Sequence, residues 1–143
     1  MANDLSLLYA LIRQYEGLYL TPYYCPAGIL TVGYGTTGHG VYPGIKWTKE
    51  ECEARMMSDV QKFVRGTLKL CPILATDDRK LCAISDFSYN LGLGNLQAST
   101  LRQRINKEDW AGAKLELLKW TRGGGKILPG LVRRRISESL LLE

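Results

Sequence analysis

Three side chains near the start of this 143-residue chain have types and a spacing suited to breaking a glycosidic bond. Glu16 is an acid, Cys25 is a thiol nine positions later, and Thr31 is a hydroxyl six positions further on. Glycoside hydrolysis usually needs a proton donor on one side of the bond and a base or nucleophile on the other. Glu16 can be the donor. Because the next acid is Glu50, only Cys25 and Thr31 are close enough in sequence for the second role.

The elements around these residues change character at Gly17. Residues 3–15 have the apolar spacing of a helix, so Glu16 falls at its C-terminal end, where the helix dipole disfavours a negative charge. Residues 18–47 are rich in Tyr, Thr, Val and Ile, with turn sequences at 26–28 and 35–40. This composition predicts short strands and hairpins in a small, irregular sheet.

The remainder of the chain has helical patterns. Thr48 and Glu51 form the spacing of a capping box, which predicts a helix from Thr48 to about Leu70 before the break at Pro72. Further helices are expected at about 76–91, 99–105, 107–120 and 131–142, with a turn at 91–95 and a glycine-rich loop at 121–130. One helix, a small sheet and a helical remainder predict a single α+β domain.

Composition restricts the partners that this chain can have. The net charge is +5 and the isoelectric point is near 9.1, which favours nucleic acid, an acidic membrane or an anionic polymer such as a cell wall. No stretch approaches the roughly 20 apolar residues of a membrane span, so we expect no stable membrane insertion. Basic residues are not interleaved with aromatic ones, so nucleic-acid binding is not favoured. The three tryptophans are expected in the core.

Two glycine-rich motifs resemble nucleotide-binding loops, but the residues around them do not fit a nucleotide-binding site. GYGTTG at 33–38 matches the spacing G-x-G-x-x-G, but the residues that follow it, HGVYPG, cannot start the helix that a dinucleotide site requires. Its glycines instead predict a turn, or a close approach of the backbone to a ligand. TRGGGK at 121–126 lacks the spacing of a phosphate-binding P-loop and is interpreted as a connector.

The cysteines give little sign of a metal site. They stand at 25, 52, 71 and 82, none forms a C-x-x-C pair, and the single histidine, His39, has no cysteine close by. A zinc site is therefore not expected. Free thiols are the default interpretation, although spacing alone leaves all three disulfide connectivities open. A dyad of Cys25 and His39 would indicate a cysteine peptidase or amidase, the alternative enzyme class.

Three consecutive arginines, Arg133, Arg134 and Arg135, lie in the predicted final helix. Side chains at three successive positions point to different sides of a helix, so at least one should face inward or sideways. An inward-facing arginine would pair with a buried carboxylate or with a substrate.

At these residues the chain resembles the phage-type lysozymes, the endolysins of glycoside hydrolase family 24, in the subset that has cysteine in the spacing E-x8-C-x5-T. The resemblance includes YEGLYLTPY, the CPAG turn and the strand TVGYGTTG. It continues through FSYNLGLGNLQASTL (87–101), DWAGAKLELLKW (109–120) and GLVRRRISE (130–138). These blocks follow the order of the family and cover essentially the whole chain.

The resemblance implies a lysozyme-like fold and a muramidase activity. A sheet lobe at about 17–47 and a helical lobe at about 1–16 and 70–143 would be joined by the long helix, with a saccharide cleft between the lobes. A monomer would cut the β-1,4 bond between N-acetylmuramic acid and N-acetylglucosamine in peptidoglycan, without metal or cofactor. A lytic transglycosylase and a non-catalytic peptidoglycan-binding module on the same fold are the alternatives.

The resemblance also assigns roles to residues. Glu16 would be the general acid, oriented by one of the three arginines, and Thr31 would orient the attacking water. Thr37, Tyr89, Asn90 and Thr100 fall where relatives line the sugar groove. Many relatives have aspartate at position 25, which is ionised at neutral pH, whereas an ordinary cysteine is mostly thiol. Cys25 must therefore be activated or serve as a neutral positioning group. Because residues 17–49 contain no carboxylate, we expect it to act as base or nucleophile, and inversion and retention both stay open.

Two further expectations concern position 36 and the route to the wall. Relatives often have histidine where Thr36 stands, so any ion pair of that histidine would be absent here. The first 17 residues lack the basic start and unbroken apolar run of a secretory signal. We therefore expect accumulation in the host cytoplasm before release to the periplasm and cell wall; export through a segment outside this sequence is the alternative.

Overall fold

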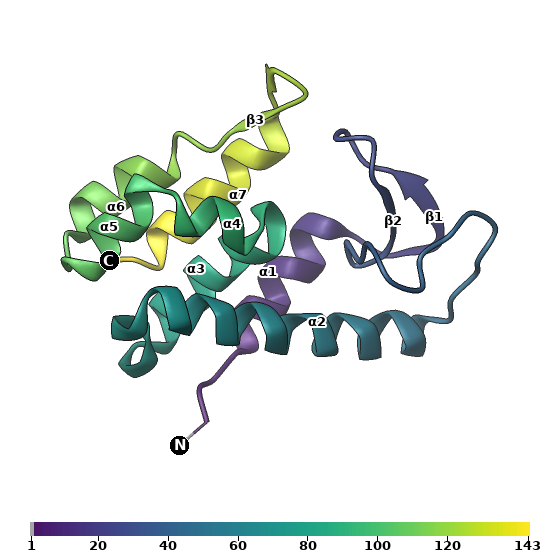
Figure 1. Ribbon diagram of the computed structural model, residues 1–143, viewed down its shortest axis with the longest axis horizontal. Coiled ribbons are helices and arrows are strands. Elements are labelled where there is room, and N and C mark those ends of the chain that lie inside the picture. The colour runs from purple at the N-terminus through teal and green to yellow at the C-terminus, as the bar shows by residue number, and fades with distance from the viewer. Residues whose placement is uncertain (1) are drawn as a thin grey trace.

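A long helix, α2 (Lys49–Leu70), joins a sheet lobe to a helical lobe in the computed structural model, which describes residues 2–143 (Figure 1). The α+β, lysozyme-like arrangement predicted from the sequence is confirmed. In chain order the other elements are α1 (Ser6–Glu16), β1 (Tyr19–Tyr24), β2 (Leu30–Gly33), η1 (Pro72–Thr76), α3 (Asp78–Leu91), α4 (Leu93–Gln97), α5 (Thr100–Asn106), α6 (Trp110–Leu117), β3 (Arg122–Gly123), β4 (Lys126–Ile127) and α7 (Pro129–Leu140).

The start of α2 has the predicted capping box. The Glu51 backbone N–H donates to Thr48 Oγ1 at 3.1 Å, and the Thr48 N–H donates to Glu51 Oε1 at 3.2 Å. These two bonds satisfy amide groups that have no partner within the helix. The helix ends at Leu70, and its C-cap, Cys71, directly precedes Pro72, which opens the 3₁₀ helix η1. Both predicted limits of this helix are therefore confirmed.

The sheet lobe is small and irregular, as expected. β1 and β2 pair antiparallel, with Tyr19 opposite Gly33 and Tyr24 opposite Leu30, and the register shifts between them. The chain then folds back so that Val32 forms a bridge with Thr36. Figure 1 shows this hairpin at one end of α2, facing the helical lobe. The lobe therefore presents the end of β1, the 25–29 turn and β2 to the space between the lobes.

Several predicted boundaries in the helical lobe are wrong. α3 begins at Asp78 with Asp77 as its cap, later than the predicted 76, because residues through Thr76 belong to η1. α6 begins at Trp110 with Asp109 as its cap, later than the predicted 107, while the Asn106 side chain donates to the Leu70 carbonyl 36 positions earlier. Residues 93–95, expected as part of a turn, belong to the helix α4, which packs on α2 and α3. The glycine-rich segment contains the short hairpin β3–β4.

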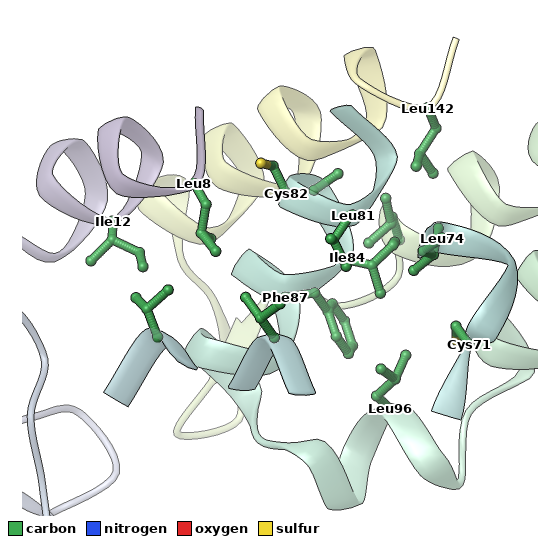
Figure 2. Packing of buried hydrophobic residues seen from close by; sticks show 14 of the residues in the cluster. Leu8, Ile12, Cys71, Leu74, Leu81, Cys82, Ile84, Phe87, Leu96 and Leu142 are labelled. Atoms are coloured by element: carbon green, nitrogen blue, oxygen red, sulfur yellow. The ribbon is translucent and has the colours of Figure 1, made fainter. Parts of the chain in front are cut away.

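The core lies around α3, which packs against α1, α2 and α7 (Figure 2). Leu8 and Ile12 of α1 and Phe87 of α3 are fully buried there. Removing such side chains from water contributes about 1.5–3 kcal/mol each. All three tryptophans pack against this core, and the Trp120 ring meets Phe87 edge-on at 5.3 Å, which confirms their expected place. Helix α3 is thus the central helix of the helical lobe.

All four cysteines are free thiols. Cys52, Cys71 and Cys82 are fully buried, and burial raises the pKa of Cys71 and of Cys82 to about 11. These three are therefore protonated core residues. Within residues 2–143, no helix is both long and apolar enough to cross a bilayer. The same residues contain no group of three His, Cys, Asp or Glu side chains placed to hold a metal ion.

Candidate active site

Glu16, Cys25 and Thr31 line one cleft of about 970 Å³ between the lobes. Glu16 is the last residue of α1, Cys25 follows β1, and Thr31 is the second residue of β2. The opposite wall is formed by the end of α3, the β3–β4 hairpin and the start of α7. Among the residues of 2–143 that line this cleft, Glu16 is the sole carboxylic acid.

Glu16 is held by Arg134, which resolves the choice among the three arginines. Arg134 Nη1 donates to Glu16 Oε2 at 2.5 Å. On its other edge, Arg134 Nε and Nη2 each donate to Asp86 at 2.8 Å. A two-bond contact fixes the plane of the guanidinium group. Asp86 on α3 therefore orients Arg134 on α7, and Arg134 in turn orients Glu16 on α1.

Asp86 and Arg134 are both almost completely buried. Burial alone would raise the pKa of Asp86, but the adjacent Arg134 guanidinium outweighs it and holds this pKa below its usual value. The Arg134 pKa is raised because the charges of Asp86 and Glu16 outweigh its own burial. The pair is therefore ionised at neutral pH and forms a rigid support behind the cleft.

The other two arginines take different places. Arg135 is fully buried; its Nη2 donates to Asn90 Oδ1 at 2.6 Å, and its Nε lies 3.0 Å from Glu138 Oε1. Arg133 is exposed at the edge of the cleft. Two of the three arginines thus face inward, in agreement with the expectation that at least one would.

The carbonyl of Ile29 connects the other two candidate catalytic residues. It accepts the backbone N–H of Cys25 at 3.0 Å and the hydroxyl of Thr31 at 2.9 Å. The Thr31 proton is therefore engaged, and its oxygen has lone pairs left only to accept. A water in the cleft could donate a hydrogen bond to Thr31 and keep a lone pair directed at a substrate in the cleft. Cys25 is half-buried on the same turn, facing the same cleft.

Three of the four predicted substrate residues lie in the cleft. Thr37, Tyr89 and Asn90 line it, and the Tyr89 hydroxyl donates to the Tyr34 carbonyl at 2.5 Å, tying α3 to the sheet lobe. Burial raises the pKa of Tyr89, so the phenol stays protonated as this donor. Thr100 is exposed at the start of α5 and does not line the cleft.

His39 and Thr36 lie apart from Cys25. His39 borders a smaller neighbouring hollow and does not line the cleft, so the structure does not bring Cys25 and His39 together as a dyad. Thr36 is buried, and its hydroxyl donates to Asp59 Oδ2 on α2 at 3.2 Å. At position 36 the side-chain contact with α2 is therefore a hydrogen bond from a hydroxyl to a carboxylate.

Sequence reasoning missed Asp86 and Glu138, the buried acids that support the arginines. Asp86 falls within residues 81–88 of α3, which are all buried, so it is a lone acid in an otherwise buried stretch. Burial raises the pKa of Glu138 well above its usual value, helped by the negative charge of nearby Asp86. A lone acid amid buried neighbours, together with an inward-facing arginine, is the signal that could have identified Asp86.

Comparison with known proteins agrees with this geometry. The model of the family Phage lysozyme matches residues 13–138. This chain belongs to the phage lysozyme family. A solved structure of an endolysin from Escherichia coli O157:H7 phage FAHEc1 superposes with a TM-score of 0.83 and 32% identity, covering 99% of this chain and 93% of that one.

Curated relatives carry the same kind of name. An endolysin of Bacillus phage B103 is 39% identical over 92% of this chain, and a SAR-endolysin of Bacteriophage PS34 is 38% identical over 84% of it. The phage lysozyme domain described here spans 50% of the length of the first relative and 71% of the second.

Proposed function

We propose that this phage lysozyme domain is an endolysin muramidase that hydrolyses the β-1,4 bond between N-acetylmuramic acid and N-acetylglucosamine in peptidoglycan during host lysis. The observation that carries the proposal is the meeting of Glu16, Cys25 and Thr31 in one cleft, with Glu16 held by Arg134. Membership of the phage lysozyme family and the endolysin names of relatives support it.

The residues divide the reaction between them. Glu16 delivers a proton to the leaving glycosidic oxygen as the bond from that oxygen to the anomeric carbon breaks. A water that donates to Thr31 attacks the anomeric carbon, and Cys25, acting as a thiolate, takes the proton of that water. If the Cys25 thiolate instead attacks that carbon itself, a thioglycosyl intermediate forms. Water then attacks the carbon, the Glu16 carboxylate takes its proton and the sulfur leaves as thiolate, so the anomeric configuration is retained.

The direct test uses the whole chain and its Glu16→Gln variant on purified peptidoglycan. Glutamine keeps an oxygen for the Arg134 hydrogen bond and cannot deliver a proton. We expect release of reducing ends to fall by about 10²–10⁴-fold, because that is the usual contribution of a positioned acid, while sedimentation with peptidoglycan persists. Undiminished release would contradict the role of Glu16. Sedimentation by a wild type that releases nothing would indicate a binding module.

A lytic transglycosylase is the second candidate, and one observation favours it. Glu16 is the sole acid lining the cleft in residues 2–143, and a transglycosylase needs one acid without a paired aspartate. Mass spectrometry of the released sugars separates the two reactions. Hydrolysis adds one water for each bond broken, whereas transglycosylation adds none and leaves 1,6-anhydro-muramic ends. The anomeric form of the first hydrolytic product then separates inversion from retention.

In this proposal the protein is a monomer whose substrate is peptidoglycan. It acts at the cell wall after release from the host cytoplasm. The basic net charge of +5 supports attraction to an anionic wall. Export through a segment outside this sequence is the alternative. The name SAR-endolysin, which some relatives carry, supports this alternative. Fractionation of host cells before lysis, followed by detection of the protein in each fraction, distinguishes the two.

A further inference from the structure

A second hollow, of about 290 Å³, adjoins the cleft and differs from it in chemistry. The two share four lining residues, none of them charged: Gly35, Thr37, Phe63 and Tyr89. The other four residues lining the hollow are all ionisable: His39, Arg55, Asp59 and Lys62. The hollow is therefore a polar extension of the cleft.

The one acid in this hollow is already engaged. Asp59 accepts a hydrogen bond from Arg55 Nε at 3.3 Å and another from Thr36 Oγ1 at 3.2 Å. Arg55 also lies over the Trp47 ring, with its guanidinium carbon 5.9 Å from the ring centroid. Arg55 and Asp59 therefore neutralise each other and are fixed by their neighbours.

Lys62 and His39 supply the uncompensated donors. Neither forms an ion pair with any side chain in the part of the chain that the structure describes. The Lys62 ammonium has three N–H donors and no acceptor, so it suits a group that only accepts. An ionised carboxylate is such a group. With the Arg55–Asp59 pair neutral, the hollow carries a net positive charge from Lys62.

We propose that this hollow is a subsite for a free carboxylate of the peptide stem of peptidoglycan, with Lys62 as its charged contact. The inference rests on the proposed function, because the stem hangs from the muramic sugar that the cleft would hold. A volume of about 290 Å³ accommodates one carboxyl-bearing side chain or chain end rather than a whole peptide. The subsite would therefore select glycan whose stem carboxylates are free over glycan whose stems are amidated or missing.

The test measures binding with the Glu16→Gln protein, which does not cut its ligand. Three tetrasaccharides of alternating N-acetylglucosamine and N-acetylmuramic acid are titrated: one with stems bearing free carboxylates, one with the same carboxyls amidated, and one without stems. Amidation keeps the size of the stem and removes its charge. Added Lys62→Glu reverses the charge in the hollow. Added Lys69→Glu is the matched control, because Lys69 is exposed on the same helix, seven residues further, and lines neither hollow.

We expect Lys62→Glu to weaken binding of the free-carboxylate ligand by about three- to tenfold, because the change removes one exposed attraction and adds a repulsion of similar size. Binding of the amidated and stem-free ligands should change by less than about twofold, and Lys69→Glu should leave all three alike. The preference of Glu16→Gln for free over amidated stems should also shrink as salt rises, because salt screens exposed charges.

Equal binding of free and amidated stems by the Glu16→Gln protein would overturn the proposal. So would an equal loss for all three ligands in Lys62→Glu, or the same loss in Lys69→Glu. A wall phosphate is the competing source of negative charge, so a glycerol phosphate oligomer is titrated as well. If Lys62→Glu weakens only that binding, the hollow does not take stem carboxylates. A different result would show that the muramidase proposal itself is wrong: the wild-type protein would release no sugar from peptidoglycan.

Discussion

The α-carbon of Gly35 lies directly against the carboxyl group of Glu16. A side chain at position 35 would bring its Cβ within 2.5 Å of Glu16 Oε1 and 2.8 Å of the carboxyl carbon. Gly35 also has φ of +81°, a conformation that side chains disfavour. The Glu16 carboxyl is therefore enclosed between the sheet-lobe backbone at Gly35 and the Arg134 guanidinium. The glycine-rich motif at 33–38 thus approaches the proposed catalytic acid.

Gly35→Ala should reduce activity far more than stability. Alanine at positive φ costs about 1–2 kcal/mol, and the new methyl group must also displace Glu16 from Arg134. We expect at least a tenfold loss in the release of reducing ends, because misplacement of a reacting group by about 1 Å is enough for such losses.

Gly44→Ala is the matched control for that variant. Gly44 has φ of +88° and open space where its Cβ would lie, so it carries the same backbone strain without touching Glu16. Urea unfolding should show similar destabilisation for both variants, with activity lost only in Gly35→Ala. Equal activity of the two would show that contact with Glu16 does not matter.

Removing Arg134 should destabilise the fold as well as the site. Arg134→Ala leaves Asp86 ionised and buried without its partner, a change that typically costs about 3–5 kcal/mol. Urea unfolding measures this loss. Arg133→Ala is the control, because Arg133 is exposed, and its cost in unfolding free energy should stay within about 0.5 kcal/mol. A small loss in Arg134→Ala would mean that Asp86 is already neutral in the wild type.

Glu138 should make the protein less stable as the pH rises. Its pKa in the folded state is well above the usual value, mainly because it is buried and also because the negative charge of Asp86 lies near it. Stability from such a group is complete below the unfolded pKa of about 4.3 and is lost as pH increases toward the folded pKa. Above pH 4.3 the unfolded chain releases this proton and the folded chain keeps it, so each pH unit costs up to about 1.4 kcal/mol.

Glu138→Gln tests that dependence, because the amide imitates the protonated acid at every pH. Unfolding free energies of wild type and variant are compared at several pH values between 4.5 and 8. We expect the difference to shift steadily in favour of the variant as pH rises. Parallel curves for the two proteins would show that Glu138 is ionised in the folded state.

Asp86 should act in the opposite direction at low pH. Its folded pKa lies below the usual value, because the Arg134 cation outweighs burial. Its stabilising contribution is therefore present above the unfolded pKa and is lost as pH falls through the folded pKa. In the same titration, we expect the stability of the wild type to decline below about pH 4 and this decline to be smaller in Asp86→Asn. A wild-type decline that persists in Asp86→Asn would place the responsible carboxyl elsewhere.

Substitutions of Cys25 test whether its sulfur takes part in the reaction. Cys25→Ser keeps the size and removes the acidity, so turnover should fall by about 10²–10⁴-fold. Cys25→Asp supplies an ionised carboxylate and should keep much of the activity. Rates of reducing-end release are measured for both, with Cys52→Ser as a control for the loss of a thiol outside the cleft. Full activity in Cys25→Ser would remove Cys25 from the mechanism.

The amino-acid sequence by itself determined the features that depend on residues close in the chain. The capping box at Thr48 and Glu51, the break at Pro72 and the order of one helix, a small sheet and a helical remainder are of this kind. They are set by bonds over three or four residues and by local periodicity. The spacing of Glu16, Cys25 and Thr31 belongs here as well, since one carbonyl, that of Ile29, links the last two.

Only the tertiary structure decided which arginine meets Glu16. Three adjacent arginines are equivalent in sequence, and the outcome depends on Asp86, 48 positions from Arg134, and on Glu16, 118 positions away. The same holds for the approach of Gly35 to Glu16 and for the helical state of 93–97, which packs on α2 and α3. A charge in the interior is tolerated only where packing brings its counter-charge within hydrogen-bonding distance, so its partner is chosen by the assembled helices rather than by neighbours in the chain.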